Sequence, residues 1–305
     1  MREASYIKLH ESGELARRAA SAKEMLLACS LCPRNCAVNR LAGEKGVCGA
    51  GAEARVSSHN AHAGEEPPIS GDNGSGTIFL THCNLKCIFC QNYPISHLGN
   101  GTTVTPERMA EMMLSLQNRG CHNINFVTPT HYMPQIVEAL DIAACAGLRI
   151  PIVYNCGGYE SLDAIRLLDG IVDIYMPDIK YSEEGPAIML SKAPDYFRRS
   201  CEAIKEMHRQ VGNLEIEEGG IASRGLLIRH LALPGGMAGS RKSLEFIARE
   251  ISPHTFISVM SQYFPAHKAL QIPKMARKIT IDEYREVVEI VDELGLENGW
   301  IQGDT

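Results

Sequence analysis

The stretch "FLTHCNLKCIFCQNYPIS", residues 79 to 96, places Cys83, Cys87 and Cys90 in a CxxxCxxC pattern. It overlaps the apolar run "TIFLT" at 77–81, which predicts a short β-strand. Closely spaced thiolates are most often metal ligands, and a structural zinc ion takes four of them. Three thiolates on a four-iron cluster instead leave one iron without a protein ligand, which is the open position that a substrate-binding centre needs. The pattern therefore predicts an open metal centre in a loop after a strand.

Downstream of residue 76, short apolar runs alternate with amphipathic helical patterns. The helix predicted from residue 105 begins at the cap Thr105 with Pro106 in its first turn, and the last helix begins at the capping box Thr280 to Glu283. Strands are predicted at 77–81, 123–128, 150–155, 172–177, 226–231 and 256–260, and helices at 105–120, 133–146, 159–169, 194–210, 240–251 and 281–294. Repeated β-then-α units predict a parallel sheet covered by helices, either a barrel or an open doubly wound sheet.

The region before this pattern has a different character. Residues 1 to about 60 carry helical patterning and a second cysteine set, and the Gly-, Pro- and Ser-rich segment 62–76 reads as a connecting loop. We therefore expect an N-terminal Cys-rich module at 1–64 and a core domain at 65–305. Four thiolates within twenty residues predict a closed site, either structural zinc or a second, fully ligated iron-sulfur cluster; they are Cys29, Cys32, Cys36 and Cys48.

Composition excludes several classes of protein. The net charge of −6 offers no basic surface for a phosphate backbone, so nucleic acid is not expected as a partner. The N-terminus lacks the apolar core of a secretory signal, and no apolar run reaches the ~18 residues that span a membrane. We therefore expect a cytoplasmic protein without structural disulfides. The four scattered cysteines are expected to be small buried side chains; they are Cys121, Cys145, Cys156 and Cys201.

With Phe89 before its last cysteine, the three-cysteine motif resembles the CxxxCxΦC signature of the radical S-adenosylmethionine (SAM) superfamily. The wider stretch "GDNGSGTIFLTHCNLKCIFCQN" (71–92) resembles the pyruvate formate-lyase activating enzyme and its uncharacterised relatives with an N-terminal four-cysteine module. The resemblance covers about residues 65–270. It implies a partial (β/α)6 TIM-like barrel, a 4Fe-4S cluster on Cys83, Cys87 and Cys90, and SAM bound beside it. It also implies reductive cleavage of SAM to a 5′-deoxyadenosyl radical, with flavodoxin or ferredoxin as the electron donor.

Polar residues follow the predicted strands, at the edge where parallel α/β folds bind ligands. Asp178 and Lys180 share a face of extended chain and match the D-x-K of the activating enzyme, which helps to hold the methionine end of SAM. Asn155, followed by two glycines, resembles the third strand end of that family and is a candidate for ribose or methionine. His230 is a further cofactor candidate, although a histidine on an apolar strand is more often a core residue.

The second strand end departs from the family pattern. The activating enzymes carry Gly-Gly-Glu there and use it to grip the SAM amino group, whereas this chain reads "VTPTHY" at 127–132. Thr128 and Thr130 could offer hydroxyl acceptors, but neither carries the charge of the glutamate. This departure favours a small-molecule or other peptide substrate over a glycyl-radical enzyme as the protein substrate. A non-catalytic iron-sulfur or zinc carrier is the alternative from another class.

Overall fold

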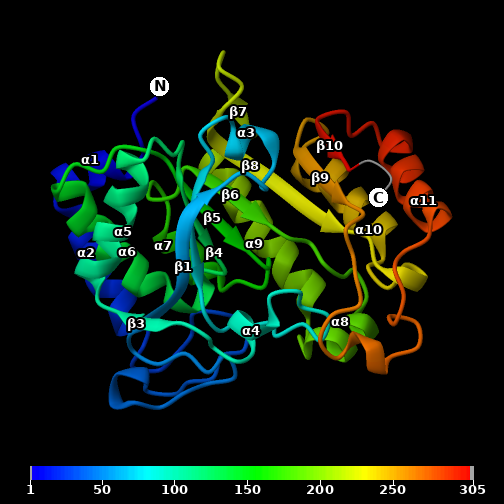
Figure 1. The fold of residues 1–305 in the computed structure, drawn as a ribbon, viewed down its shortest axis with the longest axis horizontal. Coiled ribbons are helices and arrows are strands. Elements are labelled where there is room, and N and C mark those ends of the chain that lie inside the picture. The colour runs from blue at the N-terminus through cyan, green and yellow to red at the C-terminus, as the bar shows by residue number, and fades with distance from the viewer. Residues whose placement is uncertain (1, 303–305) are drawn as a thin grey trace.

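A computed structural model describes residues 2–302 and places a ten-stranded sheet at the centre of the molecule (Figure 1). Its strand order is β10-β9-β8-β6-β5-β4-β2-β1-β3, with β7 beside β8. The parallel strands are β2 (Ser75–Leu80), β4 (Ile124–Val127), β5 (Ile152–Cys156), β6 (Ile174–Pro177), β8 (Ala222–Leu231), β9 (Phe256–Met260) and β10 (Gly299–Ile301). The antiparallel strands are β1 (Ala54–His62), β3 (Thr102–Val104) and β7 (Glu215–Ile216).

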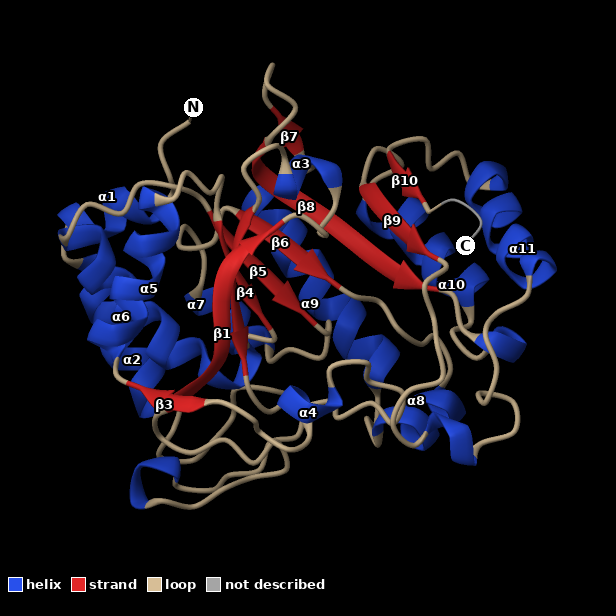
Figure 2. Cartoon of the chain, viewed as in Figure 1, coloured by secondary structure: helices blue, strands red, loops and turns tan. Residues whose placement is uncertain are grey.

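Helices lie outside this curved sheet and connect its parallel strands (Figure 2). The connecting helices are α5 (Pro106–Asn118), α6 (Met133–Cys145), α7 (Leu162–Leu167), α8 (Glu184–Ser191), α9 (Tyr196–Val211), α10 (Ser240–Phe246) and α11 (Ile281–Glu293). Thr105 caps α5 by accepting a hydrogen bond from the Arg108 amide, and the Thr280–Glu283 capping box at α11 is formed in full. The prediction of an α/β fold with a largely parallel sheet, consistent with a partial barrel, is confirmed.

The N-terminal region packs against the barrel. Helices α1 (Tyr6–Glu11) and α2 (Glu14–Glu24) lie beside α6, and Leu15, Leu26 and Leu31 join the same buried cluster as the barrel residue Phe126. The 3-10 turn η1 (Arg40–Ala42) interrupts the loop that carries the four cysteines, and β1 then pairs with β2 of the main sheet. The division at residue 64 stays a prediction. Buried residues on both sides of it belong to one hydrophobic cluster.

Two short elements complete the surroundings of the site. The predicted connecting loop 62–76 contains one helical turn, α3 (Pro67–Ser70), and a second turn, α4 (Tyr93–Ser96), follows the three-cysteine loop.

Within residues 2–302, no helix is both long and apolar enough to pass through a membrane.

Candidate functional site

The three-cysteine loop leaves the carboxyl end of β2 and turns back sharply. His82 and Lys86 adopt left-handed backbone conformations, with φ of 67° and 48°. Both are costly for residues with a side chain, so the surrounding contacts must hold the loop in place. His97 supports it by donating from Nε2 to the Cys87 carbonyl at 3.0 Å. The loop is thus held in a defined shape that directs its three thiols to one side.

Each thiol of this loop receives a hydrogen bond at sulfur. The donors are the Leu85 amide to Cys83 at 3.4 Å, the Ser191 hydroxyl to Cys87 at 3.0 Å and the Ser96 hydroxyl to Cys90 at 3.1 Å. Burial raises the pKa of Cys83 to about 12 and also raises that of Cys90, and the nearby Cys87 adds to both shifts. A thiol in such surroundings loses its proton readily only beside a cation such as a metal ion. This arrangement therefore suits metal ligation.

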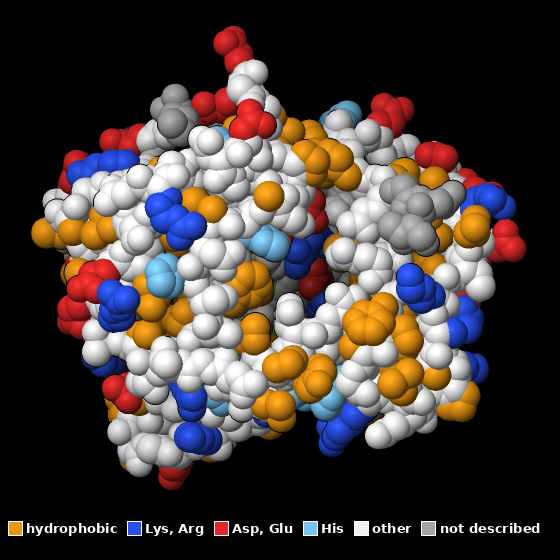
Figure 3. Space-filling model, viewed as in Figure 1, with side chains coloured by type: hydrophobic (Ala, Val, Ile, Leu, Met, Phe, Trp, Pro, Cys, Tyr) orange, Lys and Arg blue, Asp and Glu red, His pale blue; other side chains and the backbone are white. Residues whose placement is uncertain are grey.

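Cys87 and Cys90 line a cavity of about 380 Å³ that opens in the middle of one face of the molecule (Figure 3). The figure shows acidic and basic side chains deep in this hollow. An adjoining cavity of about 190 Å³ shares Cys87, Cys90 and Asp178 with the first, and reaches Cys83 and Thr128. Of the predicted cofactor residues, Phe89, Asn155, Asp178 and Lys180 line the larger cavity. Together the two cavities lie within the size range of ligand pockets, about 300–1,000 Å³.

A network of largely buried charges lines the cavity and centres on Arg229. Its Nε donates to Asp178 Oδ1 at 2.9 Å, and its Nη2 donates to Asn155 Oδ1 at 2.7 Å. Its Nη1 lies 3.4 Å from Glu65 Oε2, and Lys180 Nζ lies 2.5 Å from Asp178 Oδ2. Asp178 therefore joins both cations, because adjacent parallel strands bring the ends of β6 and β8 together.

This network fixes the charge states of its members. Burial alone would raise the pKa of Asp178, but Arg229 and Lys180 outweigh it and hold that pKa below its usual value. Burial opposes the charged form of Lys180, yet Asp178 and then Cys87 raise its pKa. Lys180 is consequently a cation at every physiological pH, close to the sulfur of Cys87.

Aromatic side chains form the apolar wall of the cavity. The ring of Phe89 contacts Tyr181 and Tyr263 edge-on, at centroid distances of 6.5 and 5.8 Å. Tyr196 lies behind them, accepts from the Lys180 amide at 3.0 Å and donates to the Gly157 carbonyl at 2.8 Å. Phe89 therefore belongs to the apolar part of the cavity lining, beside Cys87 and Cys90.

The two threonines of "VTPTHY" lie in different environments. Thr128 adopts φ of 61° and lines the smaller cavity. Thr130 is fully buried, and its hydroxyl donates to Glu160 Oε1 at 2.7 Å. Burial raises the pKa of Glu160 to about 7, although Thr130 and Tyr154 oppose that shift. The structure thus brings Thr128 to the cysteines and turns Thr130 toward Glu160.

His230 lies in the core, outside both cavities. It is completely buried; its Nδ1 donates to the Ile179 carbonyl at 2.8 Å, and its Nε2 accepts from the Ser240 hydroxyl at 2.9 Å. Burial lowers its pKa to about 4. Both ring nitrogens are therefore engaged by protein atoms, and the structure does not bring His230 to the other predicted cofactor residues.

Sequence reasoning missed Arg229 and Glu65. Alternation along a strand could have found Arg229, because it precedes His230 and so faces the opposite side of β8. Glu65 lies in a segment interpreted only as a connecting loop, and no local pattern marks it as a cavity residue.

Comparison with known proteins supports the family resemblance of the three-cysteine motif. A family model described as the radical SAM superfamily matches residues 77–216, which contain the three-cysteine loop, Asn155, Asp178 and Lys180. The uncharacterized protein MJ0674 of Methanocaldococcus jannaschii is 30% identical over 286 residues, covering 90% of this chain and 78% of that protein. The chain belongs to the radical SAM superfamily. Membership in this superfamily implies a 4Fe-4S cluster and SAM.

The residues around the cavity fit these two groups. Three thiols, of which that of Cys87 is buried and the other two are partly buried, each accept a hydrogen bond at sulfur and face a cavity that also carries a cation at Lys180. Thiolate ligands suit iron-sulfur clusters, and a cation suits the carboxylate of SAM. Within residues 2–302, no three His, Cys, Asp or Glu side chains are gathered so as to hold a single metal ion. In a cluster each thiolate binds a separate iron, and the assignment of these cysteines as its ligands stays a prediction.

The four-cysteine segment lies beside the three-cysteine loop, where Arg34 Nε donates to the Asn84 carbonyl at 2.9 Å. Two of its sulfurs also receive backbone donors: the Val47 amide donates to Cys36 at 3.4 Å, and the Ala50 amide donates to Cys48 at 3.5 Å. Burial raises the pKa of Cys48, to which the thiols of Cys29 and Cys36 add. The four thiols therefore lie near one another.

Gly46 is required for this arrangement. A Cβ atom at this position would lie 2.7 Å from the sulfur of Cys36, closer than any ordinary contact. A second glycine, Gly49, has φ of 86° and lies against the ring of His82 in the three-cysteine loop. The "GEKGVCG" portion of the segment (43–49) is thus shaped both around its own sulfur and around the neighbouring loop.

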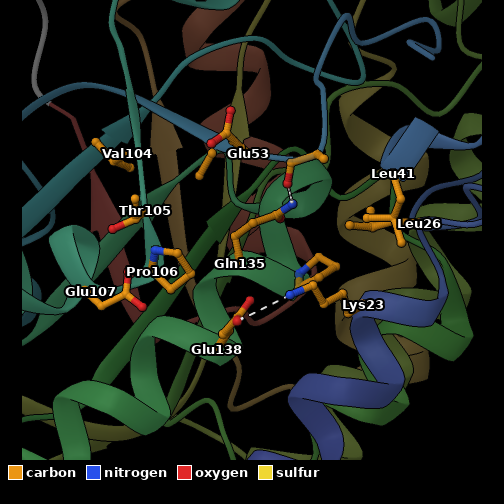
Figure 4. Close-up of a pocket in the computed structure, with 13 residues that line it drawn as sticks. Lys23, Leu26, Leu41, Glu53, Val104, Thr105, Pro106, Glu107, Gln135 and Glu138 are labelled. Atoms are coloured by element: carbon orange, nitrogen blue, oxygen red, sulfur yellow. Dashed lines mark hydrogen bonds and ion pairs between the residues drawn. The ribbon is translucent and has the colours of Figure 1, made fainter. Parts of the chain in front are cut away.

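A third cavity, of about 240 Å³, lies away from the predicted site residues (Figure 4). It is bounded by α2, α6 and the start of α5, with Lys23 and Glu138 paired at its edge. Gln135 donates to the Ala52 carbonyl at one side of this cavity. No predicted cofactor or metal residue lines it.

Proposed function

We propose that this protein is a radical SAM enzyme in which Cys83, Cys87 and Cys90 hold a 4Fe-4S cluster and the adjoining cavity binds SAM. One observation carries the proposal: the three thiols share a cavity with a buried network of Asp178, Lys180 and Arg229. A merely structural metal site would not need charged side chains in an open cavity, because buried charges are costly without a partner. When bound, the cluster and SAM together supply a one-electron reductive cleavage that yields a 5′-deoxyadenosyl radical.

The chain's own residues bind and orient the cofactor. Lys180 provides a permanent cation for the SAM carboxylate, and Asp178 fixes the direction of that ammonium group. Asn155 accepts from Arg229 through Oδ1, so its amide nitrogen is the group that can donate to the ribose or methionine. Phe89 and the tyrosines beside it exclude water from the space between thiols and strand ends.

The amino group of SAM requires a different contact from that of the activating enzymes. Thr128 lines the smaller cavity with Cys83, so we propose its hydroxyl as one acceptor. Thr130 is engaged by Glu160 and His230 by Ile179 and Ser240, so we leave both out of the proposed binding set. The Thr128 contact is neutral, because both oxygens of the nearest carboxylate, Asp178, are already engaged by Lys180 and Arg229.

The substrate is a small molecule or a peptide, with a glycyl-radical enzyme as the second candidate. The cavity favours the first class because its volume near the cysteines is modest and its walls carry balanced charges. A flavodoxin or ferredoxin is the proposed electron donor. The rival function, a non-catalytic iron-sulfur or zinc carrier, has no use for the cation at Lys180.

Anaerobic reconstitution with iron and sulfide tests the proposal. The reduced protein should show an electron paramagnetic resonance signal that changes on adding SAM, and it should release 5′-deoxyadenosine in slow turnover without substrate. Cys87→Ala should abolish both, whereas Cys145→Ala, which removes a cysteine that is exposed and not buried as the sequence predicted, should change neither. Reduced wild-type protein that carries the cluster and yet forms no 5′-deoxyadenosine would leave the carrier function in place of the enzyme.

A further inference from the structure

Arg34 connects the four-cysteine segment directly to the three-cysteine loop. It lies between Cys32 and Cys36 in sequence. Its guanidinium donates through Nε to the Asn84 carbonyl at 2.9 Å and through Nη2 to the Ser191 carbonyl at 2.7 Å. Asn84 follows Cys83, and the Ser191 hydroxyl donates to the sulfur of Cys87. A residue of the four-cysteine segment therefore binds the immediate surroundings of two sulfurs of the second set.

A second chain of contacts runs through Arg40. This arginine is completely buried, and its Nη1 lies 4.0 Å from the sulfur of Cys29 and 2.7 Å from the His131 carbonyl. His131 in turn donates from Nε2 to the Thr81 carbonyl at 2.8 Å, two residues before Cys83. The two cysteine sets are thus connected through backbone and side chains on both sides of the loop.

The segment does not need a metal ion merely to fold. Structural zinc serves small modules that cannot bury a core of their own. Here Leu26, Leu31 and Ala50 are at most 1% exposed and join the main core, and the following β1 pairs with the main sheet. A closed four-thiolate site in a segment that is already anchored requires another explanation.

The electrostatics suit a centre that gains negative charge. Four thiolates around iron carry net negative charge, and reduction adds to it. Buried charge of this kind is tolerated only beside a cation or hydrogen-bond donors. The fully buried Arg40 and the amides of Val47 and Ala50 supply both.

We propose that Cys29, Cys32, Cys36 and Cys48 hold a second, redox-active 4Fe-4S cluster that passes its electron to the cluster of the three-cysteine loop, and that Arg34 positions the two for this transfer. The inference rests on the proposed function. One electron enters from a low-potential protein donor, which is oxidised. The second cluster is reduced and then reoxidised as the first is reduced, so SAM cleavage consumes one donor electron and leaves the second cluster unchanged.

Metal counting gives the first test. Anaerobically reconstituted wild-type protein should contain roughly eight irons per chain, and Cys32→Ala/Cys36→Ala should contain roughly four, with the SAM-dependent resonance signal retained. Four irons with one zinc in the wild-type protein would overturn the inference while leaving the proposed function intact. Gly46→Ala crowds the sulfur of Cys36 and should lower iron toward the same value. Gly51→Ala, whose Cβ meets only the end of Lys45 at 4.0 Å, is its matched control.

Electron transfer gives the second test. With a reduced ferredoxin or flavodoxin as donor, the double cysteine variant should reduce its remaining cluster roughly tenfold or more slowly than the wild type. With titanium(III) citrate, a small reductant that reaches the cavity directly, both should form 5′-deoxyadenosine at similar rates. Equal rates with the protein donor would refute the relay. Absence of 5′-deoxyadenosine from wild type with the small reductant would instead refute the proposed function.

Arg34→Met separates the role of Arg34 from that of the ligands. We expect it to keep the full iron content but to slow reduction by the protein donor, because the two cysteine segments lose their shared contact. Arg198→Met, an arginine exposed on α9, should leave the rate unchanged. A full rate in Arg34→Met with full iron content would show that Arg34 has no positioning role.

Discussion

The two cysteine sets of this protein differ in what surrounds them. The three-cysteine loop borders a cavity whose other walls are charged side chains from neighbouring strand ends. The four-cysteine segment is enclosed mainly by backbone amides, glycines and the buried Arg40. One set therefore faces a pocket shared with charged strand ends, whereas the other lies mostly within its own chain, with Cys32 lining a separate cavity of about 210 Å³.

This difference shows where charged side chains contribute most to the surroundings of the cysteines. Around the three cysteines, charge is concentrated in Asp178, Lys180, Arg229 and Glu65, which can be substituted singly. Around the four cysteines, Arg40 is a fully buried cation, burial and then the buried carboxyl of Glu160 raise the pKa of Cys32, and the Val47 and Ala50 amides donate to sulfur. We therefore expect substitutions in the first region to lower the free energy of unfolding most. Substitutions in the second region should have smaller effects, each through the contacts of one side chain.

The largest effect is expected from Asp178→Asn. This change removes the one carboxylate that balances both Lys180 and Arg229, so two buried cations lose their shared partner. The free energy of unfolding should fall by about 3–5 kcal/mol, measured by urea unfolding. Glu250→Gln is the matched control: it removes an exposed carboxylate paired with Lys205 and should change stability by less than about 1 kcal/mol. Similar costs at both positions would contradict the buried network.

A somewhat smaller effect is expected from Arg40→Met. The variant keeps most of the side-chain volume but leaves the Gly51 and His131 carbonyls without their buried donor. The cost should be about 2–3 kcal/mol of unfolding free energy, since orphaned acceptors lose solvation without compensation. An unchanged urea midpoint would mean that the four-cysteine segment is held by its backbone alone.

The sequence predicted those parts of the fold that follow from local periodicity. Strand 256–260 and the caps at Thr105 and Thr280 are found where the patterns placed them. The prediction missed β1, which makes the N-terminal region part of the main sheet, because its residues alternate weakly and are largely half-exposed. It also missed β10, whose three residues are too few to carry a period.

Dependence on local patterns also explains which residues of the candidate site could be predicted. Asp178, Lys180 and Asn155 could be predicted because the ends of parallel strands converge at one edge of a sheet. Thr130 and His230 lie at similar sequence positions, yet their side chains turn to Glu160 and Ser240. Which face a residue presents after a strand ends depends on the local backbone, here the left-handed Thr128 and the 3-10 turn η2 (Thr130–Tyr132). That conformation has no signature in composition.

Acid should destabilise the protein partly through His230. Burial lowers its folded pKa to about 4 from a usual value near 6.5, so the unfolded chain binds the proton more tightly. Its contribution is complete above pH 6.5 and is lost as pH falls toward 4. Between pH 6.5 and 5 this amounts to about 2 kcal/mol. His230→Asn should flatten the dependence of unfolding free energy on pH in this range and leave SAM affinity unchanged. An equally steep dependence, or weaker SAM binding, would count against a core role.

The smallest and most discriminating effects come from the two threonines of "VTPTHY", each changed to the near-isosteric valine. Thr130→Val removes a buried donor to Glu160 and should cost about 1 kcal/mol of stability without changing the Kd for SAM. Thr128→Val should do the reverse, because its hydroxyl is proposed to meet SAM: stability should stay the same, and Kd should rise about three- to tenfold. Equilibrium dialysis with reconstituted protein measures the Kd, and urea unfolding measures the stability. If both variants weaken SAM binding alike, the cavity extends further along this loop than the side-chain contacts indicate, and Thr130 belongs with the cofactor rather than with the core.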